Sequence, residues 1–157
     1  MIRIGHAWDT HKLGSDRPLY LGGIKVDSEL GLLGHSDADV VLHAVAESLL
    51  GSLALGDLGT FYPDNISETE NMDSKIILKE CYQRILDCGY KLNNIDLTIY
   101  SQNIKIAPIR LAIQKSIADI LNVNPNMVSI KATTYEKMGF IGRGEALACE
   151  CVCLVEK

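Results

Sequence analysis

The spacing of hydrophobic residues changes along the chain between short runs and longer stretches with helical periodicity. Apolar residues recur every three or four positions in three stretches, which predicts helices at about residues 38–54, 74–89 and 109–121. Short apolar or alternating runs predict strands at about residues 2–4, 95–100, 128–133 and 146–155. The Gly22-Gly23 pair between two apolar runs predicts a hairpin over residues 18–26.

Residues that favour helix ends support these boundaries. Ser36 or Asp37 is predicted to cap the first helix, and Asp73 or Ser74 the second, because such side chains accept the N–H groups of a first turn. Pro108 precedes the third helix, where its fixed backbone suits a helix start. The polar segment 60–72 is predicted to be the loop between the first two helices.

Strands that alternate with helices after an initial hairpin predict an α/β (α+β) fold. We expect a two-layer sandwich, in which a mixed four-stranded sheet carries helices on one face and the hairpin lies beside it. The other sheet face would then be bare, and a domain of this size rarely leaves an apolar sheet face in water. We therefore predict that this face packs against copies of the chain in a closed oligomer, with Glu150 at the interface.

Composition narrows the class of protein. A length of 157 residues with 47% hydrophobic content predicts one domain over residues 1–157. No apolar run approaches the ~20 residues that span a bilayer, and the amino terminus lacks the apolar core and cleavage site of a signal peptide. Five cysteines without a Cys-x-x-Cys pair predict reduced thiols. A soluble, cytoplasmic protein is expected.

The charge distribution argues against a nucleic-acid-binding surface. The formal net charge is −5, and Lys and Arg form no cluster in the sequence. An anionic ligand would therefore have to be neutralised locally, by a metal ion, backbone N–H groups or a few placed cations.

Asp9, His11 and His43 form a candidate metal site. Asp9 and His11 are two residues apart, so an extended backbone points both side chains to the same side. His43 lies 32 residues later in a predicted helix and could add a third ligand. One carboxylate and two imidazoles leave the fourth position of a zinc ion open, as in catalytic sites.

The polar stripe around His43 leaves two interpretations open. Asp39, His43 and Glu47 are four residues apart, so they share one side of the predicted helix. Either carboxylate could orient the second imidazole nitrogen of a metal-bound His43. The alternative is a partly buried His43 that only hydrogen-bonds Asp39 one turn earlier.

Two further segments could bind phosphate. Residues 131–145 run from a predicted strand into a glycine-rich turn whose hydroxyls, amides and carboxylate could meet a phosphate and its cation. Residues 35–37 place a hydroxyl and free N–H groups at a helix start. The alternatives are a solvent-exposed loop and a plain serine cap.

Seven ordered motifs extend over essentially the whole chain. The first is Arg-Ile-Gly-His-Ala-Trp-Asp-Thr-His at residues 3–11, and the second is Gly-Leu-Leu-Gly-His-Ser-Asp at residues 31–37. The others lie at residues 42–44, 55–59, 62–64, 131–137 and 139–145. Through these motifs the chain resembles the 2-C-methyl-D-erythritol 2,4-cyclodiphosphate synthases of the non-mevalonate isoprenoid pathway, as a single cyclodiphosphate synthase domain.

The resemblance implies a homotrimer with active sites between subunits. It implies that the 2-phosphate of 4-diphosphocytidyl-2-C-methyl-D-erythritol 2-phosphate attacks the β-phosphorus, closing a cyclic diphosphate and releasing CMP. It also implies that Asp9, His11 and His43 bind one Zn²⁺ per subunit, and that Glu136 holds Mg²⁺ or Mn²⁺ against the substrate diphosphate. Such a reaction needs alignment and charge stabilisation but no protein nucleophile.

By the same resemblance, His35 and Thr134 stabilise the transition state. Arg143 and Glu150 correspond to the central cavity of the trimer, which is linked to isoprenoid diphosphates. The remaining implied role is substrate binding, which falls on Asp9, His11, His35, Ser36, Asp57, Leu58, Gly59, Tyr62, Asp64, Lys105, Ala132, Thr133, Thr134, Glu136, Phe140 and Arg143.

The chain departs from the family pattern mainly in its substrate loops, at Tyr62, Ile66, Asn103, Ile104 and Tyr135. Two other functions remain open. A zinc-dependent phosphohydrolase would activate a metal-bound water and need a general base, for which Glu47 is the nearby candidate. A non-catalytic, metal-stabilised trimer would need a closed fourth ligand, and no cysteine is placed to provide it.

Overall fold

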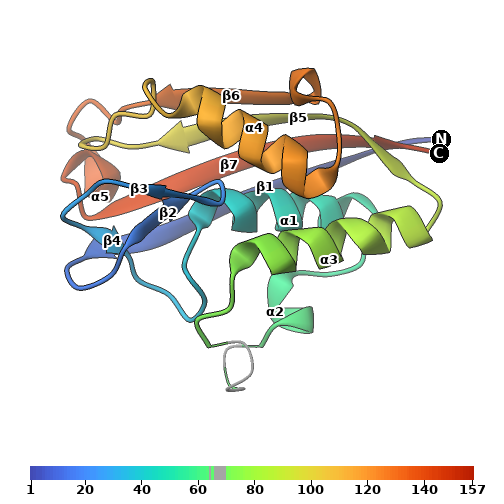
Figure 1. Ribbon diagram of the computed structural model, residues 1–157, viewed down its shortest axis with the longest axis horizontal. Coiled ribbons are helices and arrows are strands. Elements are labelled where there is room, and N and C mark those ends of the chain that lie inside the picture. Colours follow the sequence, from blue (N-terminus) through green and yellow to red (C-terminus); the bar gives the residue numbers. More distant parts are fainter. Residues whose placement is uncertain (64, 66–69) are drawn as a thin grey trace.

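A mixed sheet of five strands forms one layer of the protein in the computed structural model, which describes residues 1–63, 65 and 70–157 (Figure 1). The strand order is β4-β1-β7-β5-β6. Only β5 and β6 run parallel, while β1 pairs antiparallel with β4 and β7, and β5 antiparallel with β7. The strands are β1 (Ile2–Gly14), β4 (Gly31–Leu32), β5 (Lys91–Tyr100), β6 (Val128–Thr133) and β7 (Ala146–Glu156).

The predicted fold class is confirmed, and the sheet has one strand more than the four expected. The additional strand, β4, has two residues and pairs with the end of β1. β1 itself continues far beyond residue 4, because its ladder with β7 runs from Ile2 opposite Glu156 to Lys12 opposite Ala146. Asp9 and His11 therefore lie within a strand and share one side of it.

The predicted hairpin is also confirmed. It consists of β2 (Leu19–Leu21) and β3 (Ile24–Val26), which pair antiparallel. Gly22 and Gly23 form the turn with φ of 63° and 81°, values that residues with a Cβ adopt rarely. Such a two-residue turn matches the twist of the strands that it joins.

Three helices cover one face of the sheet (Figure 1). These are α1 (Val40–Ser52), α3 (Ser74–Asp87) and α4 (Arg110–Leu121), close to the predicted ranges. Two helical segments of four residues, α2 (Leu58–Phe61) and α5 (Gly139–Gly142), lie in the connections. Among the described residues, no helix has the length and apolar character needed to cross a membrane.

The cap of α3 was predicted correctly and the cap of α1 was not. Asp73 accepts the backbone N–H of Lys75 and caps α3. The cap of α1 is Asp39, whose carboxylate accepts the N–H groups of Val41 and Leu42, rather than Ser36 or Asp37. Asp37 is turned toward the start of α3 instead, where it accepts the backbone N–H of Ser74 at 3.0 Å.

The helix α1 is the centre of the hydrophobic core. It packs on β1 and β7 on one side and on α3 on the other, so residues on nearly every side of it are buried. Cys149, Cys151 and Cys153 of β7 face the helices and are fully buried, which agrees with their predicted common side. All five cysteines are unpaired.

The opposite face of the sheet has no helix over it in Figure 1. Ile2, Ile4 and Trp8 of β1 alternate along this face and are 65%, 67% and 39% exposed. The register places Trp8 opposite Glu150 on β7. The face is therefore apolar at one edge and carries a carboxylate near its middle.

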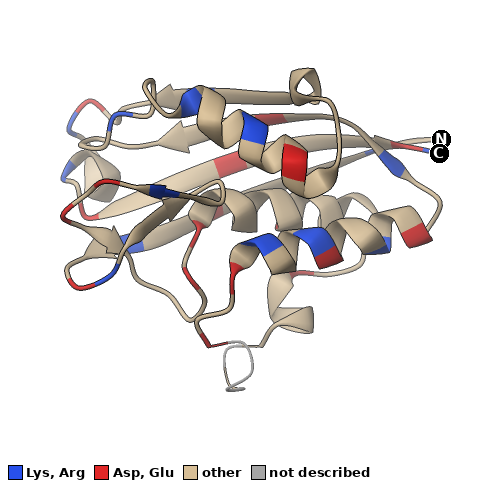
Figure 2. Cartoon of the chain, in the orientation of Figure 1, with Lys and Arg blue, Asp and Glu red and all other residues tan. Residues whose placement is uncertain are grey.

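Charged residues of both signs are mixed over the helices. Figure 2 shows Lys and Arg interspersed with Asp and Glu along α3 and α4. Lys115 and Asp119, one turn apart on α4, form an exposed ion pair of 2.5 Å. This mixture makes the outer surface of these helices polar and solvated.

We expect Gly5→Ala to destabilise the fold because α1 crosses β1 at this residue. A Cβ at Gly5 would lie 1.8 Å from the backbone carbonyl oxygen of Ser48 on α1, so the helix would have to move away. Such overpacking costs about 1–3 kcal/mol. The free energy of unfolding, measured by urea denaturation, should fall accordingly.

Gly51→Ala is the matched control. A Cβ at this helical position meets its nearest neighbour at 4.0 Å, and alanine favours helix by up to about 1 kcal/mol over glycine. This variant should be as stable as the native chain or more so. Equal losses in both variants would contradict the close approach at Gly5.

Candidate metal centre and substrate cavity

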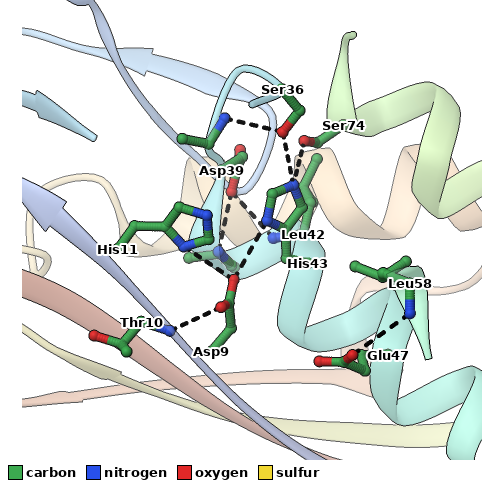
Figure 3. Close-up of polar contacts among 12 residues, drawn as sticks. Asp9, Thr10, His11, Ser36, Asp39, Leu42, His43, Glu47, Leu58 and Ser74 are labelled. Atoms are coloured by element: carbon green, nitrogen blue, oxygen red, sulfur yellow. Dashed lines mark hydrogen bonds and ion pairs between the residues drawn. The ribbon is translucent and has the colours of Figure 1, made fainter. Parts of the chain in front are cut away.

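Asp9, His11 and His43 point toward one another on the helix-covered side of the sheet (Figure 3). β1 supplies Asp9 and His11, and the first turn of α1 supplies His43. Asp9 Oδ2 lies 3.1 Å from His11 Nδ1 and 3.3 Å from His43 Nδ1. The structure thus brings together the three ligands that the sequence predicted, with one ligand atom of each within 4.8 Å of the others.

The cluster fits a divalent metal ion. Asp9 Oδ2 and His11 Nδ1 are buried and lie 3.1 Å apart, and neither has a hydrogen-bond partner among the described residues. Buried polar atoms rarely lack a hydrogen-bond partner. Two such atoms that lie side by side without a hydrogen bond therefore indicate a ligand, such as a metal ion, that both would bind. One carboxylate oxygen and two imidazole nitrogens form a ligand set that zinc accepts, with a fourth position left for substrate or water.

The neighbouring imidazoles lower the pKa of Asp9 and so favour the ionised carboxylate that a metal ligand requires. Burial would raise the pKa of Asp9, but the neighbouring imidazoles of His11 and His43 hold it well below its usual range. Burial lowers the pKa of His43, while the Asp9 carboxylate more than offsets this and raises it. Because a metal binds only the deprotonated nitrogen, a proton competes with the metal for His43 in acid.

Two serine hydroxyls contact the other nitrogen of His43. His43 Nε2 lies 2.9 Å from Ser74 Oγ and 3.1 Å from Ser36 Oγ (Figure 3). The expectation that Asp39 or Glu47 holds this nitrogen is therefore wrong. The Asp39 side chain accepts four backbone N–H groups, and Glu47 accepts the N–H of Leu58 at 3.5 Å.

The metal cluster lies at one side of a cavity of about 370 Å³. Five other residues implied as substrate contacts line it, namely His35, Ser36, Leu58, Gly59 and Tyr62. The lining also includes Leu33, Gly34, Glu47 and Ile77, which the resemblance did not single out. Asp57 caps α2 beside the cavity by accepting the N–H and the hydroxyl of Thr60, and Asp64 lies outside the described residues.

Tyr62, one of the departures from the family pattern, has a defined partner. Its hydroxyl donates a hydrogen bond of 2.5 Å to Glu80 on α3. Burial and this carboxylate raise the pKa of Tyr62. The Tyr62 hydroxyl therefore links the cavity wall to α3. Ile66, a second departure, lies outside the described residues.

A second group of implied site residues lies at the far edge of the sheet. Thr133 pairs with Tyr100, Tyr100 with Ala148, and Ala148 with Thr10, the neighbour of Asp9. Three strand spacings separate the two ends of this row, about 14 Å. Thr134 donates a hydrogen bond of 3.0 Å to Glu136 just beyond β6. One chain therefore does not bring Thr134 and Glu136 to the metal cluster.

The remaining implied contacts are also away from the cavity. Ala132 and Thr133 are exposed near the end of β6, and Lys105 is exposed in the segment after β5. Phe140 is 42% exposed on α5, and Arg143 pairs with Glu145 at 2.6 Å. All of them are accessible in a single chain, as contacts with a ligand or a second subunit require.

The chain is similar to known proteins over nearly its whole length. The YgbB family matches residues 2–156. The 2-C-methyl-D-erythritol 2,4-cyclodiphosphate synthase of Natranaerobius thermophilus is 46% identical over 156 residues, which cover 99% of each chain.

Two solved structures extend the comparison. The bifunctional IspDF of Campylobacter jejuni superposes with a TM-score of 0.95 and 37% identity over 99% of this chain, which corresponds to 42% of that longer protein. The CDP complex of Plasmodium falciparum IspF superposes with a TM-score of 0.86 and 36% identity over 98% of this chain and 95% of that one.

We expect Zn²⁺ to stabilise the native chain much more than the His43→Ala variant. A ligand that binds only the folded state at a hundred times its dissociation constant adds about 2.7 kcal/mol to the free energy of unfolding. His43→Ala removes one of three ligands and should lose most of this gain. Denaturation of the metal-free and Zn²⁺-saturated proteins measures both values.

His6→Ala is the control, since His6 lies on the bare sheet face and pairs with Glu150 at 2.9 Å. It should keep the full stabilisation by Zn²⁺. A zinc effect of the same size in all three proteins would show that the ion binds elsewhere.

Proposed function

The chain belongs to the YgbB family, and we propose that Asp9, His11 and His43 bind the zinc ion that serves its reaction. The chain converts 4-diphosphocytidyl-2-C-methyl-D-erythritol 2-phosphate into 2-C-methyl-D-erythritol 2,4-cyclodiphosphate and releases CMP, in non-mevalonate isoprenoid precursor biosynthesis. The observation that carries the metal assignment is the convergence of three ligands at the wall of the cavity.

In this reaction an oxygen of the 2-phosphate attacks the β-phosphorus, and the bond from that phosphorus to the bridging oxygen of the α-phosphate breaks. That oxygen leaves with CMP. Both reacting groups belong to one substrate, so the protein mainly aligns them and stabilises charge. A bound divalent ion supplies positive charge beside the diphosphate oxygens.

Different residues of the protein would bind different parts of the substrate. Asp57, Leu58 and Gly59 lie at the cavity and would hold the methylerythritol part, while Ser36 and His35 would hold phosphate oxygens. Thr134 would donate to a phosphoryl oxygen, and Glu136 would hold Mg²⁺ or Mn²⁺ against the diphosphate. Lys105, Ala132 and Thr133 would contact the cytidine end, and the CDP bound to the Plasmodium falciparum relative supports a cytidine site.

We propose that the active unit is a homotrimer whose active sites lie between subunits. Two observations support it. The bare sheet face exposes Ile2, Ile4 and Trp8, apolar side chains that a second copy would bury. The implied site is also divided between the cavity and the far sheet edge, so Thr134 and Glu136 of one subunit would complete the cavity of another.

Two further assignments follow from this assembly and from the cysteines. Glu150 and Arg143 would face the central cavity of the trimer, where we propose that an isoprenoid diphosphate binds. Glu150 is held on the bare face by Tyr100 at 2.6 Å and His6 at 2.9 Å. The bacterial cytoplasm is the proposed location, because its reducing conditions suit five unpaired thiols.

The direct test is turnover followed by phosphorus NMR. The native chain should release CMP and form the cyclic diphosphate, and His43→Ala should do neither while keeping its fold. Lys115→Ala, on the outer surface of α4, should retain native activity. Linear phosphate products would favour the zinc phosphohydrolase, with Glu47 in the cavity as its base. Near-normal turnover by His43→Ala would overturn the zinc assignment.

If the protein is a trimer, two isoleucine substitutions should affect its oligomeric state differently. Ile4→Glu places a charge on the bare sheet face and should yield monomers without activity. Ile76→Glu changes an isoleucine of α3 that is 48% exposed on the helical side and should leave the assembly intact. Light scattering after gel filtration should give three times the mass of one chain for the native protein and Ile76→Glu. A native protein that stays monomeric contradicts the proposal.

A further inference from the structure

The hydrogen bonds of His43 extend away from the metal cluster to the start of α3. Ser74 is the first residue of α3 and is fully buried, and its Oγ lies 2.9 Å from His43 Nε2. Asp37 contacts the same serine twice, accepting both its hydroxyl proton and its backbone N–H. A chain of contacts thus runs from Asp37 through Ser74 to His43 and on to Asp9.

The direction of the Ser74 hydroxyl follows from its partner. The Asp37 carboxylate can only accept hydrogen bonds, so the Ser74 hydroxyl must donate to it. The lone pairs of Ser74 Oγ are then left for His43. A group that offers only lone pairs requires its neighbour to donate, so His43 Nε2 must carry a proton.

Ser36 imposes no such requirement. Its Oγ lies 3.1 Å from the same nitrogen and accepts the backbone N–H of Ala38. Among the described residues, no acidic side chain accepts a hydrogen bond from the Ser36 hydroxyl. Ser36 could therefore donate to His43 Nε2 as well as accept from it, and by itself it leaves the tautomer open.

We propose that Asp37 and Ser74 are positioning residues that fix the tautomer of His43, with the proton on Nε2 and the lone pair of Nδ1 directed at the metal. A neutral imidazole has one protonated nitrogen and one free lone pair, so a proton fixed on Nε2 makes Nδ1 the ligand. His43 Nδ1 is the nitrogen that faces Asp9, at 3.3 Å. The inference rests on the metal role proposed above.

At many metal sites a carboxylate accepts the second N–H of a histidine ligand and so orients it. Here a serine hydroxyl lies between the carboxylate and the imidazole. Loss of such an outer contact commonly weakens metal binding about 10- to 100-fold. It also ties the ligand on α1 to the first turn of α3, a helix that supplies none of the three ligands.

The first experiment measures the affinity of the intact protein for Zn²⁺ by competition with a chromophoric chelator. Ser74→Ala should weaken binding about 10- to 100-fold. Asp37→Asn should also weaken it, and the double variant should bind no more weakly than the worse single variant, because both changes break one link. Ser36→Ala should have a much smaller effect on affinity.

The second experiment identifies the tautomer directly. Long-range ¹H–¹⁵N spectra of the Zn²⁺-loaded native protein should show the metal on Nδ1 of His43 and a slowly exchanging proton on Nε2. In Ser74→Ala this proton should exchange faster. Ser52→Ala controls for the loss of a buried hydroxyl, since Ser52 donates only to Leu49 within α1. It should match native affinity.

The outcomes separate this inference from the proposed function. A native protein that binds no Zn²⁺ overturns the metal role itself. Native binding with equal affinity in Ser74→Ala overturns the positioning role and leaves the metal site standing. Coordination through Nε2 in the native spectra overturns it as well, even if Ser74→Ala fails to fold. Additive losses in the double variant would show that Asp37 does not act through Ser74.

Discussion

The buried carboxylate of Asp39 sets the position of α1, and the site depends on where that helix begins. Asp39 is fully buried and accepts the N–H groups of Gly22 and Gly23 in the hairpin turn as well as those of Val41 and Leu42 in the first turn of α1. Burial raises the pKa of Asp39 even with four donors around it. Satisfying these donors at once requires the hairpin and the helix start to meet at one point, which places the first turn of α1 over β1.

The two faces of the sheet differ in what they carry. Its helix-covered side holds the candidate metal ligands of β1 and α1, together with a cavity whose lining includes residues of α2. The bare side presents apolar side chains and the Glu150 carboxylate. The row from Thr10 to Thr133 runs across four strands, so the groups at the far edge share one end of the sheet with the metal cluster but stay about 14 Å from it. In the proposed trimer, contact between subunits would therefore complete the site as well as bury the apolar face.

The sequence predicted those features that depend on local periodicity. The three long helices, the hairpin and the shared side of Asp9 and His11 all follow from spacing or turn residues. The length of β1 was underestimated because its polar residues after Ile4 lack the apolar pattern of a strand. Pairing with β7 is what makes this segment a strand. The cap of α1 and the partner of His43 were mispredicted for a related reason. Asp37 and Asp39 are equivalent as local capping residues, and only contacts with the hairpin and with Ser74 distinguish them.

The crossing of α1 over β1 at Gly5 ties together the two elements that carry the proposed metal ligands. With the Ser48 carbonyl oxygen almost in contact with the backbone of Gly5, helix and strand cannot slide or separate without losing this fit. Asp9 and His11 on one element and His43 on the other then behave as parts of a single rigid body. The spacing of the three donor atoms is therefore set by the contact between one helix and one strand, and not by the loops that border the cavity.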